Sequence, residues 1–255
     1  MKMQRICAAY FSPTRTTKSV LQTMLSQFDF PKIEIDLTPY ENRNNEYLFG
    51  ESDLVIMGVP VYGGRVPSTA ENRIRLMKGY NTPIVLVVTY GNVHHAGSIN
   101  ELQQLVCANG FIPIAAAAIV SEHNVTKGIA TGRPNEQDFK EMNAFIRQIN
   151  EKVSYLNCFE SIAIEGKKSS HQRDMLPIKP HGNKKCVSCG ICGKLCPTQS
   201  IANPRKTADA TCIRCMRCIK ICPKKARTYG KLKEITAKCF LKIVSHGEKQ
   251  SAFFI

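Results

Sequence analysis

The sequence predicts an α/β protein in which a doubly wound, five-stranded parallel sheet is followed by a small α+β domain rich in cysteine. Five short apolar runs alternate with helical patterns along residues 1–165, which is the order that βαβ units produce. Hydroxyl-rich or glycine-containing turns follow the first, third and fourth runs. Residues 186–223 then repeat one cysteine pattern twice.

The five apolar runs are predicted to be strands because most do not alternate with polar residues, as is typical of parallel strands buried on both faces. They span Ile6–Phe11, Ile33–Leu37, Leu54–Val59, Ile84–Thr89 and Ile112–Val120. Helical spacing of apolar residues follows the first run and recurs at 99–108, 139–155 and 234–245. We expect the strand order 2-1-3-4-5, in which ligands bind at the carboxyl ends of the strands around the switch point.

The turn after the first strand is rich in hydroxyl groups and leads directly into a helical pattern. It reads Ser12-Pro13-Thr14-Arg15-Thr16-Thr17. Backbone N–H groups and the positive end of the helix dipole attract anions at such a position, and hydroxyl groups add donors. The alternative is an ordinary helix N-cap with spare hydroxyl groups.

Two further turns end the third and fourth strands. They read Pro60-Val61-Tyr62-Gly63-Gly64 and Thr89-Tyr90-Gly91-Asn92. Adjacent glycines let the main chain approach a flat ligand closely, and the Tyr62 ring offers a face for stacking. In the predicted strand order all three turns meet at one edge of the sheet, so we predict a ligand site there.

The two cysteine runs, CVSCGICGKLCP and CIRCMRCIKICP, each have the spacing C-x2-C-x2-C-x3-C-P, which is typical of bacterial ferredoxins with [4Fe-4S] clusters. In this pattern the fourth cysteine of each run binds the cluster of the other run. The predicted ligand sets are Cys186, Cys189, Cys192 and Cys222 for one cluster, and Cys212, Cys215, Cys218 and Cys196 for the other. Zinc sites would not need four cysteines twice, and disulfide frameworks suit small secreted domains. We expect Cys7 and Cys107 to pack in the core, and Cys158 and Cys239 to be spare thiols, because both clusters are already complete.

Charge is distributed unevenly along the chain. Residues 1–165 contain 15 Lys and Arg against 16 Asp and Glu, whereas residues 166–255 contain 20 against 4. This predicts attraction to an acidic redox protein, with an encounter sensitive to salt. Binding to nucleic acid or to a membrane surface is the alternative, but no nucleic-acid motif accompanies the basic residues. No apolar run is long enough to span a bilayer and no leader is evident, so we expect a cytoplasmic protein, with oxygen-sensitive clusters suited to an anaerobic setting.

The first part of the chain resembles a flavodoxin, in which the phosphate loop is approximately Ser/Thr-x-Thr-Gly-x-Thr. Ser12, Thr14 and Thr17 match this loop, whereas Arg15 stands where the family usually has glycine. Together with the cysteine runs, nearly the whole chain resembles the flavodoxin–ferredoxin fusion proteins called EFR1-family ferredoxins. The resemblance extends through residues 58–67 and the 131–134 turn, which reads Thr-Gly-Arg-Pro.

The resemblance implies FMN as a cofactor beside the two [4Fe-4S] clusters. It implies that Ser12, Thr14, Thr16 and Thr17 hold the FMN phosphate, with Arg15 beside it. The isoalloxazine ring would be framed by Pro60, Val61, Tyr62, Gly63, Gly64, Thr89, Tyr90, Gly91 and Asn92. It also implies three parts: a flavodoxin-like FMN domain at 1–165, a linker at 166–183, and a 2[4Fe-4S] ferredoxin domain with a C-terminal helix and tail at 184–255.

These features favour an electron carrier, in which electrons pass between FMN and the clusters and on to a protein partner. The alternative is an FMN-dependent reductase of a small organic or quinone substrate, with His94 or His95 as the acid. No G-x-G-x-x-G or Walker sequence follows a strand, so a built-in nicotinamide site is not indicated. The linker is long enough to let electrons pass between the two subunits of a homodimer instead of within one chain. A homodimer is therefore the alternative to transfer within one chain.

Overall fold

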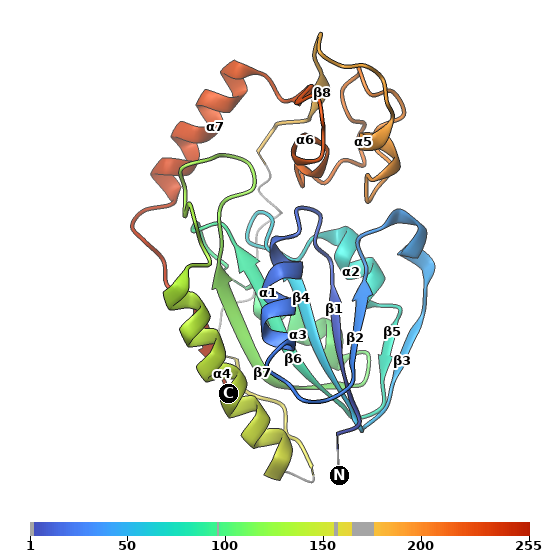
Figure 1. Ribbon diagram of the computed structural model, residues 1–255, viewed down its shortest axis with the longest axis vertical. Helices are drawn as coiled ribbons and strands as arrows, with labels where there is room; N and C mark the ends of the chain where they lie inside the picture. Colours follow the sequence, from blue (N-terminus) through green and yellow to red (C-terminus); the bar gives the residue numbers. More distant parts are fainter. Residues whose placement is uncertain (1–2, 96, 156–157, 165–175) are drawn as a thin grey trace.

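The computed structural model describes residues 3–95, 97–155, 158–164 and 176–255. Its main sheet has the strand order β10-β7-β6-β4-β1-β2 (Figure 1). The strands are β1 (Arg5–Tyr10), β2 (Lys32–Asp36), β4 (Asp53–Pro60), β6 (Thr82–Tyr90), β7 (Phe111–Val120) and β10 (Ala252–Phe254). Apart from β10, the neighbouring strands are parallel. The five predicted strands correspond in chain order to β1, β2, β4, β6 and β7. Their predicted order 2-1-3-4-5 is confirmed, since it is the observed order β2-β1-β4-β6-β7 of a flavodoxin-like sheet.

The sheet has six strands rather than the five predicted from sequence. β10 pairs antiparallel with β7, where Ala252 lies opposite Ala118 and Phe254 opposite Ala116. Phe253 packs against Phe145 of α4, with 5.1 Å between the ring centroids, whereas Phe254 packs on the other face of the sheet. The tail therefore covers the edge of β7 and partly buries an aromatic ring on each face of the sheet.

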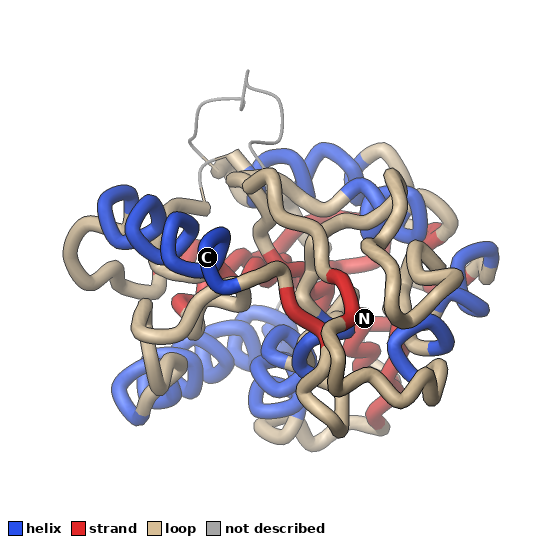
Figure 2. The backbone as a smooth tube through the Cα atoms, turned by 90° about the horizontal axis from the view of Figure 1, so that it is seen from above, coloured by secondary structure: helices blue, strands red, loops and turns tan. Residues whose placement is uncertain are grey.

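Four helices cover the two faces of the sheet (Figures 1 and 2). They are α1 (Thr16–Leu25), α2 (Ser68–Ile74), α3 (Ser98–Cys107) and α4 (Glu136–Tyr155). The apolar faces of α1 and α4 share one core, and those of α2 and α3 share the other. Gly58 lets α1 approach β4 closely, because a Cβ there would lie 2.5 Å from the Leu21 side chain.

Short elements occupy segments that the sequence analysis leaves as loops. β3 (Tyr47–Phe49) and β5 (Met77–Gly79) form a separate parallel pair. A 3₁₀ helix, η1 (Tyr40–Asn44), lies in the polar stretch between β2 and β3.

The cysteine-rich part lies beyond the carboxyl ends of the parallel strands (Figure 1). It contains β8 (His181–Gly182), α5 (Ile191–Lys194), α6 (Arg217–Lys220), β9 (Arg227–Thr228) and α7 (Lys231–Val244). β8 pairs with β9, so the end of the predicted linker 166–183 is tied to the cysteine-rich part, whereas its residues 166–175 lie outside the described chain. None of the described helices combines the length and apolar character that a bilayer crossing requires.

Candidate functional site

The β1–α1 turn brings its hydroxyl groups to the carboxyl edge of the sheet. Ser12 is buried, and its Oγ accepts a hydrogen bond from the Lys18 backbone N–H at 2.9 Å. The hydroxyls of Thr17 and Thr89 lie 2.7 Å apart, which joins this turn to the end of β6. Thr14, Arg15 and Thr16 line an open pocket that α4 borders. The residues predicted to hold a phosphate are therefore close together. The hydroxyls of Ser12 and Thr17 are buried under the turn, whereas Thr14, Arg15 and Thr16 face the pocket.

Arg15 stands where flavodoxins usually have glycine, and its backbone adopts the left-handed conformation that glycine tolerates best. Its φ is 69°, in the region where a Cβ costs roughly 1 kcal/mol or more. Its carbonyl accepts the hydrogen bond from the Ser19 N–H at 2.9 Å, so the residue begins α1, and its side chain is exposed. The turn keeps its shape with arginine in place of glycine.

The Pro60–Gly64 turn is a tight reversal held from both sides. Tyr62 and Arg65 exchange backbone hydrogen bonds of 3.0 and 3.2 Å, and Gly63 and Gly64 both have positive φ, as a two-residue type I′ turn requires. Arg65 is anchored by two hydrogen bonds to the Glu101 carboxylate of α3. The Tyr62 hydroxyl is buried and has no hydrogen-bond partner within the described chain.

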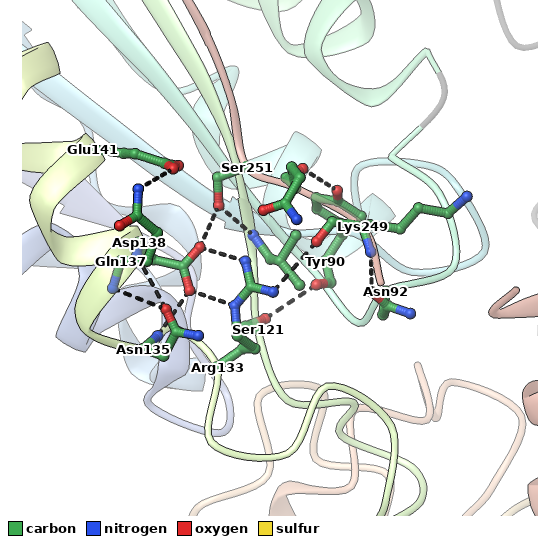
Figure 3. A network of polar contacts seen from close by, with 12 residues as sticks. Tyr90, Asn92, Ser121, Arg133, Asn135, Gln137, Asp138, Glu141, Lys249 and Ser251 are labelled. Carbon is green, nitrogen blue, oxygen red and sulfur yellow. Dashed lines mark hydrogen bonds and ion pairs between the residues drawn. The ribbon is translucent and has the colours of Figure 1, made fainter. Parts of the chain in front are cut away.

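The β6 turn is held by the C-terminal tail. The Asn92 Nδ2 donates to the carbonyls of Ser245 and Gly247, and its Oδ1 accepts from the Lys249 N–H. The Tyr90 hydroxyl donates to the Gln250 carbonyl at 2.9 Å. Figure 3 shows both side chains turned toward this tail. These two predicted ring-framing side chains therefore bind residues 245–250, a role that sequence spacing does not indicate.

The same tail is fixed on its other side by a carboxylate. Asp138 accepts hydrogen bonds from the Arg133 guanidinium, the Asn135 N–H and the Ser251 hydroxyl (Figure 3). Burial alone would raise the pKa of Asp138. The three donors, of which Arg133 has the largest effect, together hold this pKa below its usual range. The tail is thus clamped between α4 and the β6 turn.

His123 is a residue near the site that the sequence analysis missed. It lies against Gly91, where a Cβ would be 2.5 Å from the imidazole, so glycine is required at that position for packing. Its Nδ1 accepts from the Val125 N–H at 3.2 Å. Burial, and to a smaller degree Lys220, lowers the pKa of His123 to about 4. No pattern surrounds this histidine in the sequence, because its neighbours come from separate turns.

The two cysteine runs fold as a structural repeat in which each residue has its counterpart 26 positions later, as Cys186 has in Cys212. Left-handed backbone recurs at equivalent positions: Ser188 and Arg214, Gly190 and Met216, Gln199 and Lys225. The short helices α5 and α6 are also equivalent and pack against each other. The repeated spacing thus corresponds to a repeated backbone path.

Cysteines of each predicted set lie near one another. Cys186, Cys189, Cys192 and Cys222 line a single pocket. In the other set, burial raises the pKa of the Cys215 thiol, and the proximity of Cys218, Cys196 and Cys212 raises it further. Burial likewise raises the pKa of Cys218 to about 11. All twelve cysteines are free thiols, and no three His, Cys, Asp or Glu residues among those described form a group that could hold a metal ion.

Three arginines with buried Nε atoms lie close to these cysteines. Arg227 donates to the carbonyls of Pro180, Pro204 and Lys206 and lies beside Cys218. Within the described residues, the Nε atoms of Arg214, Arg217 and Arg227 are buried without an acceptor. Buried N–H donors normally have partners, so these three are available for an anionic group.

The second cysteine run contacts the edge of the sheet where the predicted ligand turns meet. The Arg217 guanidinium donates to the Pro13 carbonyl at 2.9 Å, and the Asn124 amide donates to the Cys215 carbonyl at 3.3 Å. Tyr62 lies close enough to Cys215 for the sulfur to raise the pKa of its hydroxyl, in addition to the larger effect of burial. Buried Arg73 joins α2 to the Pro197 carbonyl at 2.7 Å. The cysteine-rich part is therefore packed on the candidate site.

Comparison with known proteins gives a weak structural likeness. No protein-family model and no curated protein matches the chain. Among solved structures, a flavodoxin from the domain Archaea is 12% identical with a TM-score of 0.43, covering 60% of this chain and 100% of its own. Flavodoxin 2 from Bacillus cereus is 14% identical with a TM-score of 0.44, covering 58% and 99%. The FMN-bound flavodoxin of Fusobacterium nucleatum is 15% identical with a TM-score of 0.39, covering 59% and 99%.

Proposed function

We propose that this protein is an electron carrier that holds FMN and two [4Fe-4S] clusters and passes electrons between them and on to a protein partner. The proximity of the second cysteine run to two of the three ligand turns, through Pro13 and Tyr62, carries the proposal. Residues 1–165 form the flavin domain and residues 184–255 the cluster domain, with the C-terminal tail returning to the flavin domain's sheet.

The cysteines and arginines fit two anionic clusters. Thiolates are the ligands that iron–sulfur clusters require, and each set offers four sulfurs with no histidine among them. The unpaired Nε atoms of Arg214, Arg217 and Arg227 would donate to cluster or cysteine sulfur, and hydrogen bonds of this kind tune reduction potentials. When bound, the clusters would supply single electrons and FMN would accept one or two.

The ligand turns fit FMN in a defined way. The hydroxyls of Thr14 and Thr16 and the N-terminus of α1 would hold the phosphate, because N–H groups at a helix start favour anions. The Tyr62 ring and the Gly63–Gly64 main chain would contact the isoalloxazine. Tyr90 and Asn92 would support their turn through the tail and leave its main chain to face the ring.

The contact between the two parts gives electrons a route within one chain. Tyr62 from the β4 turn and Asn124 from the loop after β7 both lie beside Cys215. The cluster held by Cys196, Cys212, Cys215 and Cys218 would therefore be the one nearer the flavin. The other cluster would be the one nearer the partner.

The outer pocket suits an acidic redox partner. Val187 and Ile191 line it and are exposed. Lys224 also lines it, and the exposed Lys184, Lys185 and Lys194 each lie within two residues of a cysteine that lines it. An apolar centre bordered by lysines complements a protein surface with a ring of carboxylates, and charge of this kind raises association rates. We place the exit for electrons at this pocket.

Cofactor content tests the proposal. Anaerobic reconstitution of the full chain with iron, sulfide and FMN should give about eight iron, about eight sulfide and about one FMN per chain. Cys215→Ser should lose about half of the iron, whereas the exposed Cys239→Ser should lose none. A colourless product, or one that takes zinc in place of iron, would refute the cluster assignment.

A further inference from the structure

Helix α7 presents a broad apolar face to solvent. Only Ala237 and Leu241 of this helix are buried. Its exposed large apolar side chains are Leu232 at 75%, Ile235 at 59%, Phe240 at 52%, Ile243 at 71% and, at the end of the helix, Val244 at 37%. In Figure 1 the helix lies along the outer edge of the molecule, beside the cysteine-rich part. Contiguous apolar surface of this kind marks an interaction site.

The exposed residues form one stripe along the helix. Leu232, Ile235, Cys239 and Ile243 recur at intervals of three and four residues, which places them in a row on a helix surface. Phe240 widens this row at its C-terminal half. Since Ala237 and Leu241 lie on the opposite side, the stripe faces away from the protein that supports the helix.

Lysines border the stripe. Lys231, Lys238 and Lys242 lie along one border and Lys233 along the other, whereas Glu234 is the only acidic residue of the helix. The C-terminal part of the chain that contains α7, residues 166–255, is itself strongly basic, with 20 Lys and Arg against 4 Asp and Glu. The surface that α7 complements is therefore apolar and negatively charged.

We propose that α7 lies on an anionic lipid surface, with its apolar stripe inserted at the boundary between headgroups and acyl chains. Basic amphipathic helices bind such surfaces by burying the apolar face while lysines reach the headgroups. A second copy of this chain would bring two lysine borders of the same charge together, so the charges favour lipid. The proposal requires neither cofactor and goes beyond electron transfer.

Vesicle co-sedimentation tests this inference with the full chain loaded with its cofactors. Vesicles of phosphatidylcholine containing about 30% phosphatidylglycerol should bind the protein at least tenfold more tightly than phosphatidylcholine alone. Binding should weaken as salt is added. No binding to the anionic vesicles, or equal binding to both kinds, would overturn the proposal.

Paired variants separate the stripe from general surface effects. Ile235→Glu with Ile243→Glu should reduce binding to anionic vesicles at least tenfold, because charges replace inserted side chains. Lys238→Gln with Lys242→Gln should reduce it by roughly tenfold. The control is Leu48→Glu, another exposed apolar residue, located on β3, and it should leave binding unchanged. Light scattering that shows a dimer of the native chain, lost in the Ile235→Glu, Ile243→Glu variant, would assign the stripe to a second copy and overturn the lipid proposal.

Discussion

The two cysteine runs have the same spacing and the same left-handed backbone positions. The two predicted ligand sets that they form, however, have different surroundings. The set of Cys186, Cys189, Cys192 and Cys222 lines a small pocket with exposed neighbours, and Cys189 is itself exposed. In the other set, Cys196, Cys215 and Cys218 are all buried, and this set lies against the ligand turns of the sheet. The repeated spacing thus gives one set that faces outward and one that faces inward, and the difference lies in what is packed around each.

The largest expected effect separates the two sets by their cysteines. Cys215→Ser should abolish rapid electron exchange between flavin and clusters, because the inward cluster is lost. Cys189→Ser should preserve that exchange and abolish transfer to an external acceptor protein. Stopped-flow absorbance at flavin and cluster wavelengths distinguishes them. Equal loss of flavin–cluster exchange in both variants would remove the distinction between inward and outward sets.

Mild acid should lower the stability of the protein through His123, which lies near the candidate site. The pKa of His123 is lowered to about 4 by burial, so the unfolded chain binds more protons than the folded chain between about pH 4 and 6.5. Stability from this residue is present above pH 6.5 and is lost as pH falls toward 4, by up to about 3 kcal/mol. Urea unfolding across this range should be less pH-dependent in His123→Gln, whereas the exposed His246→Gln should behave like the native chain. An unchanged pH dependence in His123→Gln would contradict this assignment.

The outward side should be sensitive to charge reversal. Lys184→Glu with Lys224→Glu should slow association with an acidic acceptor protein by about tenfold at low salt. The effect should shrink at high salt, because exposed charges are screened. Lys78→Glu, on β5 and exposed, is the matched control in the sheet domain. Association kinetics at several salt concentrations provide the measurement, and a rate that the double variant leaves unchanged would place the docking surface elsewhere.

The smallest effect compares the equivalent positions Gly190 and Met216. Both have positive φ. A Cβ on Gly190 meets no atom within 4 Å, so Gly190→Ala should cost only the backbone strain, about 1 kcal/mol. Met216→Gly relieves strain but removes a side chain packed against Ile178 and Tyr229, and should destabilise the protein by about 1–2 kcal/mol in sum. A stabilised Met216→Gly in thermal unfolding would show that packing there contributes less than strain.

The sequence alone predicts the features that depend on local patterns. The apolar runs, the cysteine spacing and the Gly63–Gly64 turn are each contained within a few residues, and the strands and their order are confirmed. β10 was missed because it pairs with β7 across more than a hundred residues of chain. The roles of Asn92 and Tyr90 were missed for the same reason, since their partners lie at 245–250.

The contact between the two halves shows the same limit. Arg73 and Asn124 join the cysteine-rich part to the sheet, yet neither stands in a motif. His123 and Gly91 come together only because two turns meet at one edge. The FMN and cluster residues therefore follow from spacing and resemblance, whereas the order in which electrons would visit them follows only from the folded chain.

Laser-flash reduction of the bound FMN in the fully loaded protein would follow electrons as they leave the flavin. We expect the absorbance of the clusters to bleach as the flavin reoxidises, at a first-order rate that does not change with protein concentration. A rate that rises in proportion to concentration would mean that electrons pass between chains, and would contradict a route through the contact of the second cysteine run with the ligand turns.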